Sequence, residues 1–210
     1  MKLTFYIAIF FLAVCGLSFG QSYKVIESTT DHIKVEFNFE NSYSIVDTSI
    51  DGRTFQYIRG KSFPMLTAGE PNVPAYYINI GIPAYSTPQI KIVSVTKSIY
   101  ENKFILPKPA EDTVVKALSI KDLNEKIYGT NKLFPSEASA IIDDYYYRFA
   151  RIIILNASPF QFNPVSRQLI YNKKILVEVD FGGASLLGAA KNYLQSFNKV
   201  MQTLLDLPFI

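Results

Sequence analysis

The side chains that could perform acid–base or nucleophilic chemistry are few in this chain of 210 residues. It has one histidine, His32, which follows Asp31, and one cysteine, Cys15. A histidine–aspartate dyad needs a nucleophile that it can activate, and the sequence gives no reason to assign one. We therefore interpret His32 as a histidine in a surface turn and predict no catalytic residue.

Two pairs of neighbouring carboxylates, Asp143-Asp144 and Glu111-Asp112, could in principle act as an acid and a base. Neighbouring residues on a strand point to opposite faces, so neither pair converges on one bond as a glycosidase requires. Neither pair has the spacing of a known calcium-binding loop. The sequence therefore predicts no metal site and no cofactor.

Three consecutive tyrosines, Tyr145-Tyr146-Tyr147, could form a stacking platform for a sugar or a peptide. Tyrosines on a strand are also typical of one core ring flanked by two rings at the edge of a sheet. We favour the second interpretation and keep the first as the alternative.

The first 20 residues have the pattern of an export signal. A lysine precedes an apolar run over residues 5–14, and Ser18 and Gly20 place small side chains where a signal peptidase reads them. We expect cleavage before Gln21. The apolar run is too short for a membrane span, so we predict none in the mature chain.

Signal removal takes Cys15 with it. The mature chain then has no disulfide, no thiol nucleophile and no thiolate metal ligand. A lipid anchor on Cys15 is the alternative, but Val14 stands where a small residue is expected. The remainder is long enough for one hydrophobic core.

Composition favours a β-rich protein. The chain has 14 Tyr, 16 Phe and no Trp, and a formal net charge of +3. Aromatic residues are enriched in strands, and so small a charge gives no support to nucleic-acid binding.

Period-two alternation of apolar residues predicts antiparallel strands at residues 33–39, 89–99 and 175–181. Asp51-Gly52 predicts a hairpin between residues 43–50 and 54–58. We interpret residues 134–181 as two long strands joined by a tight turn at Asn163-Pro164, because proline fixes φ.

A different period follows Gly182-Gly183. Apolar residues recur at helical spacing and predict an amphipathic helix that ends before Pro208: Leu187, Ala190, Leu194, Phe197, Met201 and Leu204. We interpret the two glycines as a hinge towards a following domain.

Residues 106–129 show little periodicity. They contain two prolines and the lysines Lys108, Lys116, Lys121 and Lys126. We predict a long loop with a short turn of helix, and a loop of this length in a compact domain is usually functional or disordered.

Several segments occur in an ordered set that resembles a known family. They are Val25-Ile26-Glu27-Ser28-Thr29, Gly69-Glu70-Pro71-Asn72-Val73-Pro74, residues 102–107, Leu133-Phe134-Pro135-Ser136-Glu137, Asp143-Asp144, Gln161-Phe162-Asn163-Pro164 and Leu169-Ile170-Tyr171. Together they resemble the N-terminal prodomain of the gingipain-type cysteine proteases, over roughly residues 23–181.

The resemblance implies an all-β, antiparallel sandwich or barrel-like prodomain at residues 21–181, between a signal peptide at 1–20 and a hinge and helix at 182–210. Such prodomains help a secreted protease to fold and keep it latent. The implied parent is a cysteine endopeptidase of Bacteroidetes-type bacteria, exported to the periplasm and then, through a type IX system, to the cell surface or medium. Its active site would lie in a catalytic domain beyond Ile210, which makes this chain itself a non-enzyme.

The resemblance also implies a partner and a contact. The partner is the cognate catalytic domain, in cis, or in trans if the chain is complete. In the family a basic residue of a prodomain loop enters the specificity pocket of the protease. This chain has Val114 where the family's arginine is expected, so we choose Lys116 as the inhibitory residue, then Lys108 and Lys121. A long cationic side chain can reach and pair with a pocket carboxylate. The alternative function is a stand-alone secreted β-sandwich that binds peptide or carbohydrate.

Overall fold

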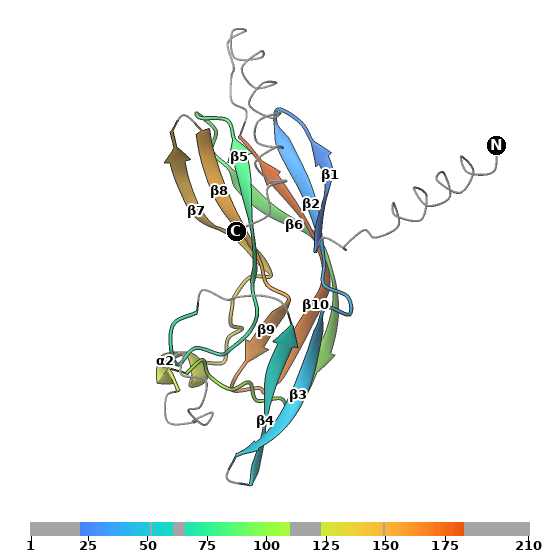
Figure 1. Ribbon diagram of the computed structural model, residues 1–210, viewed down its shortest axis with the longest axis vertical. Coiled ribbons are helices and arrows are strands. Elements are labelled where there is room, and N and C mark those ends of the chain that lie inside the picture. The colour runs from blue at the N-terminus through green and yellow to red at the C-terminus, as the bar shows by residue number, and fades with distance from the viewer. Residues whose placement is uncertain (1–21, 51, 61–65, 110–122, 149, 183–210) are drawn as a thin grey trace, which may run out of the picture.

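The computed structural model describes residues 22–50, 52–60, 66–109, 123–148 and 150–182. Nearly all regular structure in them is antiparallel β, arranged in an elongated molecule (Figure 1). The prediction of an all-β antiparallel fold is confirmed. The predicted signal residues Ser18, Gly20 and Gln21 and the predicted helix after Gly183 lie outside the described residues.

The largest sheet has five strands. Its order is β1 (Tyr23–Ser28), β2 (His32–Asn38), β10 (Gln168–Asp180) and β6 (Gln89–Tyr100), and β9 (Phe160–Asn163) pairs with the first residues of β10. Strand β10 is the central strand, hydrogen-bonded to three others, and it runs along much of the molecule (Figure 1).

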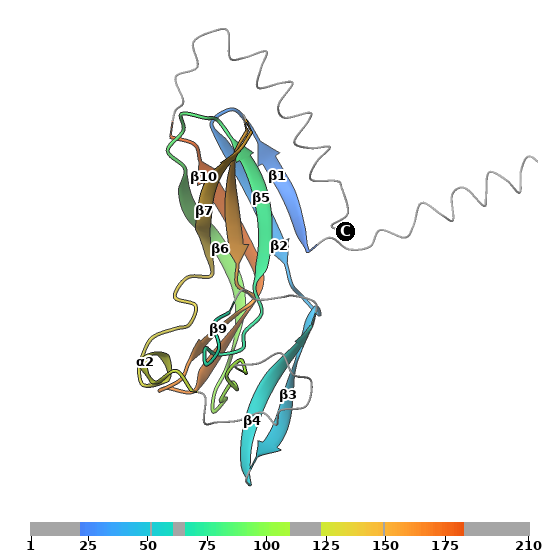
Figure 2. The same ribbon diagram turned by 60° about the vertical axis from the view of Figure 1, so that its left-hand side comes forward.

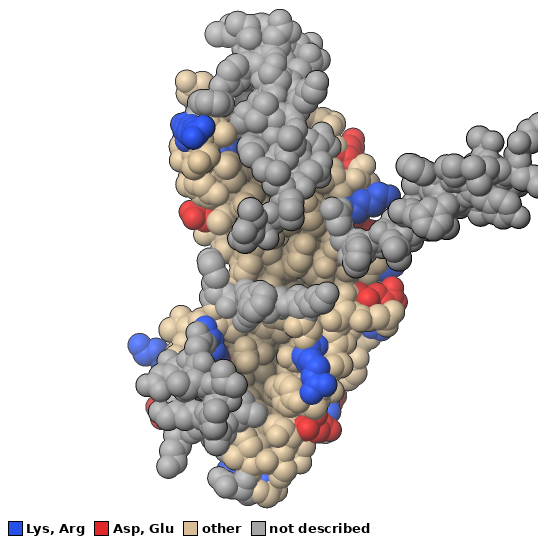
Figure 3. All heavy atoms as spheres, in the orientation of Figure 1, with Lys and Arg blue, Asp and Glu red and all other residues tan. Residues whose placement is uncertain are grey.

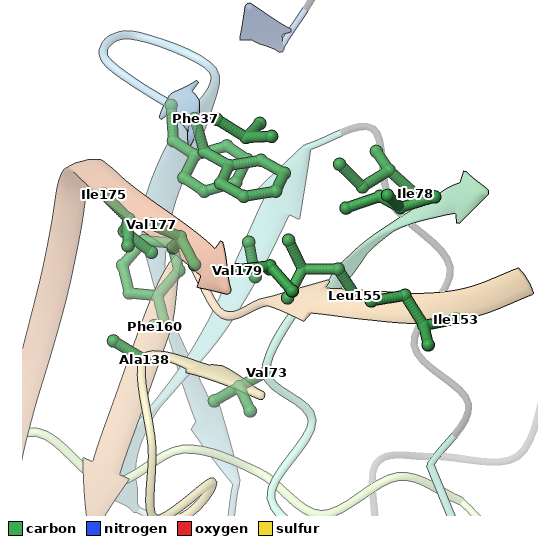
Figure 4. Close-up of a cluster of buried hydrophobic side chains, with 14 of the residues drawn as sticks. Phe37, Val73, Ile78, Ala138, Ile153, Leu155, Phe160, Ile175, Val177 and Val179 are labelled. Atoms are coloured by element: carbon green, nitrogen blue, oxygen red, sulfur yellow. The ribbon is translucent and has the colours of Figure 1, made fainter. Parts of the chain in front are cut away.

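A second sheet lies across the upper half of the first (Figures 1 and 2). It consists of β5 (Tyr76–Ile82), β8 (Ala150–Ala157) and β7 (Ser139–Tyr147), in that order. The inward-facing residues of both sheets form the core, because alternate side chains of a strand point to the same face. Phe37, Ile153, Leu155, Ile175 and Val177 have 0% of their surface exposed and lie in the cluster of Figure 4.

A hairpin of β3 (Tyr43–Ile50) and β4 (Arg53–Gly60) extends at the other end of the molecule (Figure 2). Gly52 in its turn has φ of +75°, a conformation in which glycine carries no steric cost. The buried Gln56 connects the hairpin to the chain after β6: its N–H donates to the Phe104 carbonyl (2.9 Å), and its carbonyl accepts from the Leu106 N–H (3.0 Å).

The prediction of two long strands in residues 134–181 is correct for the second strand and wrong for the first. The structure divides the first into three strands: the chain turns after Tyr147, so that β7 and β8 pair antiparallel, and it is interrupted again at Ser158-Pro159, so that β8 belongs to one sheet and β9 to the other. Proline has no N–H for a sheet ladder, and the Ser158 N–H donates instead to the Ala138 carbonyl (2.8 Å). The turn after Asn163 is confirmed, and the Asn163 side chain accepts hydrogen bonds from the N–H groups of Val165 and Ser166.

Helical structure in the described residues is limited to α2 (Glu125–Tyr128), the short turn of helix that the sequence predicted in the loop. None of the described residues form a helix that is long and apolar enough to cross a membrane.

Candidate functional site

The predicted loop 106–129 begins with residues that are not loop-like. Leu106 is buried and its N–H donates to the Gln56 carbonyl, and the residue before the loop, Ile105, is also buried and forms an isolated bridge with Gln56. Pro107 forms an isolated bridge with Pro71. The start of the loop is therefore held in the core, and the chain leaves this anchored part only after Lys108.

The two ends of the loop meet at one glycine. The Gly69 N–H donates to the Lys108 carbonyl (2.9 Å), and the Gly69 carbonyl accepts from the Asn124 N–H (3.0 Å). The Lys108 N–H donates to the Glu70 carbonyl (2.8 Å). We call Gly69, Glu70, Lys108 and Asn124 the Gly69 clamp. Lys108 and Asn124, which lie on either side of residues 109–123, are thus bonded to the same buried glycine.

The turn that carries the clamp is closed by its own hydrogen bonds. The Glu70 carboxylate accepts from the Thr67 N–H (2.9 Å), and the Glu70 N–H donates to the Thr67 carbonyl (3.2 Å). Gly69 has φ of +86°, which a residue with a Cβ rarely adopts. The sequence marked this segment as part of the family resemblance and gave no sign of what the turn would hold.

The far end of the clamp is fixed by helix α2. Asn124 is its N-cap, and the Asn124 side-chain oxygen accepts from the Lys126 N–H (3.1 Å). The Tyr128 hydroxyl donates to the Ile105 carbonyl (2.8 Å), and burial raises the pKa of Tyr128. The Tyr128 ring stacks on Phe104 with centroids 5.5 Å apart and contacts Phe162 edge-on.

The three candidate lysines have different positions relative to the clamp. Lys108 belongs to it, and the half-buried Lys108 ammonium group donates to the Leu66 carbonyl (3.0 Å). Lys116 and Lys121 fall between the two clamped ends and lie outside the described residues.

A second cluster of charged and aromatic side chains lies at the opposite end of the molecule, where β7 ends (Figure 1). Arg151 donates from Nε and Nη2 to the two carboxylate oxygens of Asp144 (2.9 and 2.6 Å). Its Nη1 donates to the carbonyls of Ala84 (3.1 Å) and Ser86 (2.7 Å). We call these four residues the Arg151 network.

The Arg151 network shows what the carboxylates of the pair Asp143-Asp144 bind. The hydrogen bond from Arg151 holds the pKa of Asp144 below its usual value, and the same bond raises the pKa of Arg151. Asp143 accepts a hydrogen bond from the Asp144 N–H (2.8 Å). The structure therefore gives Asp144 the role of an ion-pair partner that holds a loop. Glu111-Asp112 lies outside the described residues.

None of the three consecutive tyrosines, residues 145–147, is the core ring that the sequence predicted among them. Tyr145 is half-buried, whereas Tyr146 and Tyr147 are each 59% exposed. Strand β7 is the edge of its sheet and has a register shift at Ile142, which moves the following side chains out of simple alternation. The Tyr146 hydroxyl donates to the Ala84 carbonyl (2.7 Å), which fixes that ring in place.

His32 lies at the start of β2, beside the turn from β1. Its Nδ1 is 3.2 Å from the Thr29 hydroxyl, and its Nε2 is 3.3 Å from a Glu27 carboxylate oxygen. The order Thr29, His32, Glu27 resembles the nucleophile, base and acid of a catalytic triad. The Thr29 hydroxyl, however, also forms hydrogen bonds with the backbone of Asp31 and His32, so its role is to stabilise the turn. Hydrogen bonding to Lys34 lowers the pKa of Glu27.

Charged side chains are few and scattered among uncharged ones on the face of the molecule that Figure 3 shows. Within the ranges that the structure describes, no cluster of His, Cys, Asp and Glu is arranged to hold a metal ion.

Comparison with solved structures defines the fold. The chain is similar to the complex of Porphyromonas gingivalis RgpB pro- and mature domains, with a TM-score of 0.67 and 19% identity over 84% of this chain and 95% of that one. It is also similar to the structure on the zymogenic latency of gingipain K from the same organism, with a TM-score of 0.57 and 22% identity over 79% and 94%. The fold is that of a gingipain prodomain.

Sequence comparison shows the family. The family model Propeptide_C25 matches residues 21–205, and the chain belongs to this family, as the resemblance predicted. It is 27% identical to Lys-gingipain of P. gingivalis over 80% of its length and 25% identical to gingipain R1 over 78%. It spans only 10% and 18% of the lengths of those two proteins.

Proposed function

We propose that this chain is the prodomain of a secreted, gingipain-type cysteine protease, and that it assists the folding of the catalytic domain and keeps it latent. The observation that carries this proposal is the match of a propeptide family over residues 21–205. The fold is in agreement, because the solved RgpB complex with TM-score 0.67 consists of a pro- and a mature domain.

The proposed partner is a cysteine protease catalytic domain, encoded in cis or supplied in trans. Catalysis is assigned to that domain, and this chain contributes binding and occlusion. We place an export signal at residues 1–20, the prodomain at 21–181, and a hinge and helix towards the catalytic domain at 182–210. Export would lead to the periplasm and then to the cell surface or medium.

We further propose that Lys116 enters the specificity pocket of the protease, with Lys121 as the second choice. Both residues belong to the segment whose ends the Gly69 clamp holds. Lys108 is less suited to this role, because its ammonium group already donates to the Leu66 carbonyl. A lysine in an acidic pocket would pair with a buried carboxylate, which is costly to leave unpaired.

The first experiment is to sequence the DNA downstream of the Ile210 codon and to express any protease domain found in frame. The purified chain should inhibit that domain. Lys116→Ala should weaken inhibition by roughly 2–5 kcal/mol, because the pocket carboxylate loses its partner. Lys121→Ala and Lys108→Ala should cost about 0–1 kcal/mol, the range of exposed pairs.

The outcomes separate the parts of the proposal. Inhibition that survives Lys116→Ala but is lost with Lys121→Ala would change the choice of residue. If none of the three lysines matters, the cationic contact is wrong, and inhibition must arise from steric covering by the β-domain. A wild-type chain that does not inhibit would contradict the proposed function itself.

A second candidate function is a surface binding module, supported by the exposed tyrosines at the end of β7. Tyr146 and Tyr147 are 59% exposed, and Tyr85 in the neighbouring loop is 91% exposed. Titration with soluble oligosaccharides, with Tyr147→Ala as the matched variant, tests this function. Binding that Tyr147→Ala removes would favour it over the prodomain role.

A further inference from the structure

We propose that the end of the sandwich where β7 turns into β8 is a docking surface for the catalytic domain, formed by Tyr85, Tyr147 and Arg148. We call these three residues the Tyr85 surface. The inference rests on the proposed prodomain function and adds a contact outside the specificity pocket. The partner that fits is a protein face with an apolar pocket for a tyrosine ring and a carboxylate for a guanidinium group.

A firmly held loop between β5 and β6 presents Tyr85, whose surface is 91% exposed. The carbonyls on either side of it, those of Ala84 and Ser86, accept hydrogen bonds from Arg151 Nη1 (3.1 and 2.7 Å). The buried Ser86 hydroxyl donates to the Pro83 carbonyl (2.8 Å) and closes the turn. A side chain on a backbone that is already fixed costs little ordering entropy on binding, and tyrosine is enriched among the anchor residues of interfaces.

Arg148 has an unfavourable backbone conformation at the turn from β7 into β8. Its φ is +57°, in the left-handed region that a residue with a Cβ disfavours. Its guanidinium group lies 5.6 Å from the centre of the Tyr147 ring. Among the residues that the structure describes, no carboxylate forms an ion pair with Arg148. The turn therefore accepts a conformational cost to present a cation that a carboxylate of a partner can bind.

The geometry of the rings favours a protein partner over a sugar. A sugar stacks on a free face of an aromatic ring, whereas guanidinium groups lie over one face of Tyr147 and of Tyr146, at 5.6 and 5.9 Å from the ring centres. Tyr85, at 91% exposure, protrudes from the molecule, whereas sites for small ligands are concave. Tyrosine and arginine are the residue types that contribute most to the energy of protein interfaces.

The course of the chain indicates why the partner is the catalytic domain. Strands β5, β7 and β10 finish at the same end of the molecule (Figures 1 and 2). The Tyr146 hydroxyl donates to the Ala84 carbonyl (2.7 Å), which joins β7 to the β5–β6 loop. The Thr87 N–H of that loop donates to the Phe181 carbonyl (3.0 Å), so β10 finishes beside it. Under the proposed function the chain continues from here to the catalytic domain, and a tethered partner has a high effective concentration near this surface.

The main test compares Arg148→Gly with Arg167→Gly in the purified chain. Both arginines are exposed and have nearly the same φ, +57° and +55°, but Arg167 lies in the turn between β9 and β10. Glycine adopts this conformation readily, so both variants should unfold in urea close to wild type. Only Arg148→Gly should weaken binding to the protease domain encoded downstream, with a Kd about tenfold higher by titration calorimetry, because a charge-assisted contact is lost.

A second test changes the protruding ring. Tyr85 is 91% exposed, so Tyr85→Ala should fold as wild type does. Its Kd for the protease domain should rise about 30-fold, the effect of losing an anchor residue, whereas Tyr85→Phe, which keeps the ring, should stay within about threefold. Mass spectrometry after iodination should find Tyr85 modified in the free wild-type chain and protected in the complex.

The results distinguish this inference from the proposed function. If wild type, Tyr85→Ala and Arg148→Gly bind the protease domain equally well, the docking surface is wrong and the prodomain function stands. If Arg167→Gly weakens binding as much as Arg148→Gly, the effect does not belong to this surface, and the inference is again wrong. Binding of chitohexaose that Tyr85→Ala removes, with no change in the Kd for the protease domain, would show that the surface binds sugar instead. If wild type does not bind the protease domain, the prodomain function itself fails and this inference fails with it.

Discussion

The two ends of this molecule fix their loops in different ways. At one end the Gly69 clamp uses backbone groups around a buried glycine. At the other end the Arg151 network uses a charged side chain that binds Asp144 and the carbonyls of the loop after β5. The backbone hydrogen bonds of the clamp join uncharged groups and should respond little to salt, whereas a partly exposed ion pair responds to salt and to acid.

The difference has a functional meaning under the proposed prodomain role. The clamp bonds the two described residues that flank the proposed inhibitory segment, Lys108 and Asn124, to Gly69. A surface ion pair holds the β5–β6 loop, from which no inhibitory side chain is proposed. The following three predictions test the comparison, in order of decreasing effect.

The largest effect should come from Phe162→Ala, which removes the aromatic support below the clamp. Phe162 is fully buried, its ring contacts Phe104 and Tyr128, and its N–H and carbonyl pair with Phe134. Urea unfolding should show a loss of about 3–5 kcal/mol, the cost of such a cavity. Val165→Ala is the control, because Val165 is 51% exposed and should change stability by less than about 0.5 kcal/mol. Equal losses in the two variants would contradict this account.

An intermediate effect is expected for Tyr128→Phe. The change removes the hydroxyl that binds the Ile105 carbonyl and leaves a buried acceptor unpaired, at a cost of about 1–3 kcal/mol. The variant should also change the response to alkaline pH. Burial raises the pKa of Tyr128 above its ordinary value of 10.0, so the folded protein retains a proton that the unfolded chain loses.

The contribution of Tyr128 is therefore fully present below about pH 10 and decreases as the pH rises above that value. Urea unfolding at pH 8 and pH 11 measures it. Tyr128→Phe should lose less stability between the two pH values than wild type does. A remaining loss is expected from Tyr76 and Tyr171, whose pKa values burial also raises. An unchanged pH dependence would show that Tyr128 has no such role.

The smallest effect should come from the Arg151 network. Arg151→Ala should cost about 1 kcal/mol at low salt and less in 1 M salt, because its side chain and that of Asp144 are 16% and 34% exposed. Arg151→Lys should not restore the loss, since lysine lacks the planar fork that binds both carboxylate oxygens. A cost independent of salt would indicate packing rather than charge.

The pH dependence at this end has the opposite direction. Because the pKa of Asp144 lies below its ordinary value of 3.8, its contribution is present above about pH 4 and is lost as the pH falls through the folded-state pKa. Asp144→Asn should remove that acid-dependent part.

The strands show which features of the fold a sequence pattern predicts and which it does not. Alternation at residues 33–39 and 175–181 correctly predicted β2 and the end of β10, because one face of each strand is buried. The strand that contains Ile152 was predicted to continue to Asn163, whereas it changes sheets at Ser158-Pro159. Local preference does not determine which sheet a β-rich segment joins, since that depends on partners far away in the chain.

The candidate site likewise has features that the sequence predicted and features that it did not. The basic composition of the loop and the short helix α2 could be predicted from the sequence. The role of Gly69 could not, because its hydrogen bonds join residues that are distant in sequence. The predicted core tyrosine was wrong because β7 is an edge strand with a bulge, and neither property is visible in three consecutive tyrosines.

What the sequence alone determined is the family resemblance, the antiparallel β class, the hairpin at Gly52 and the basic loop with its short helix. These depend on local preference, alternation and the order of motifs along the chain. Only the tertiary structure decided that Gly69 binds both Lys108 and Asn124 through its backbone groups. It also decided that the Lys108 ammonium group donates to the Leu66 carbonyl and that Asp144 pairs with Arg151. The physical reason is that hydrogen bonds and ion pairs between distant segments exist only after the sheets have packed and fixed their register.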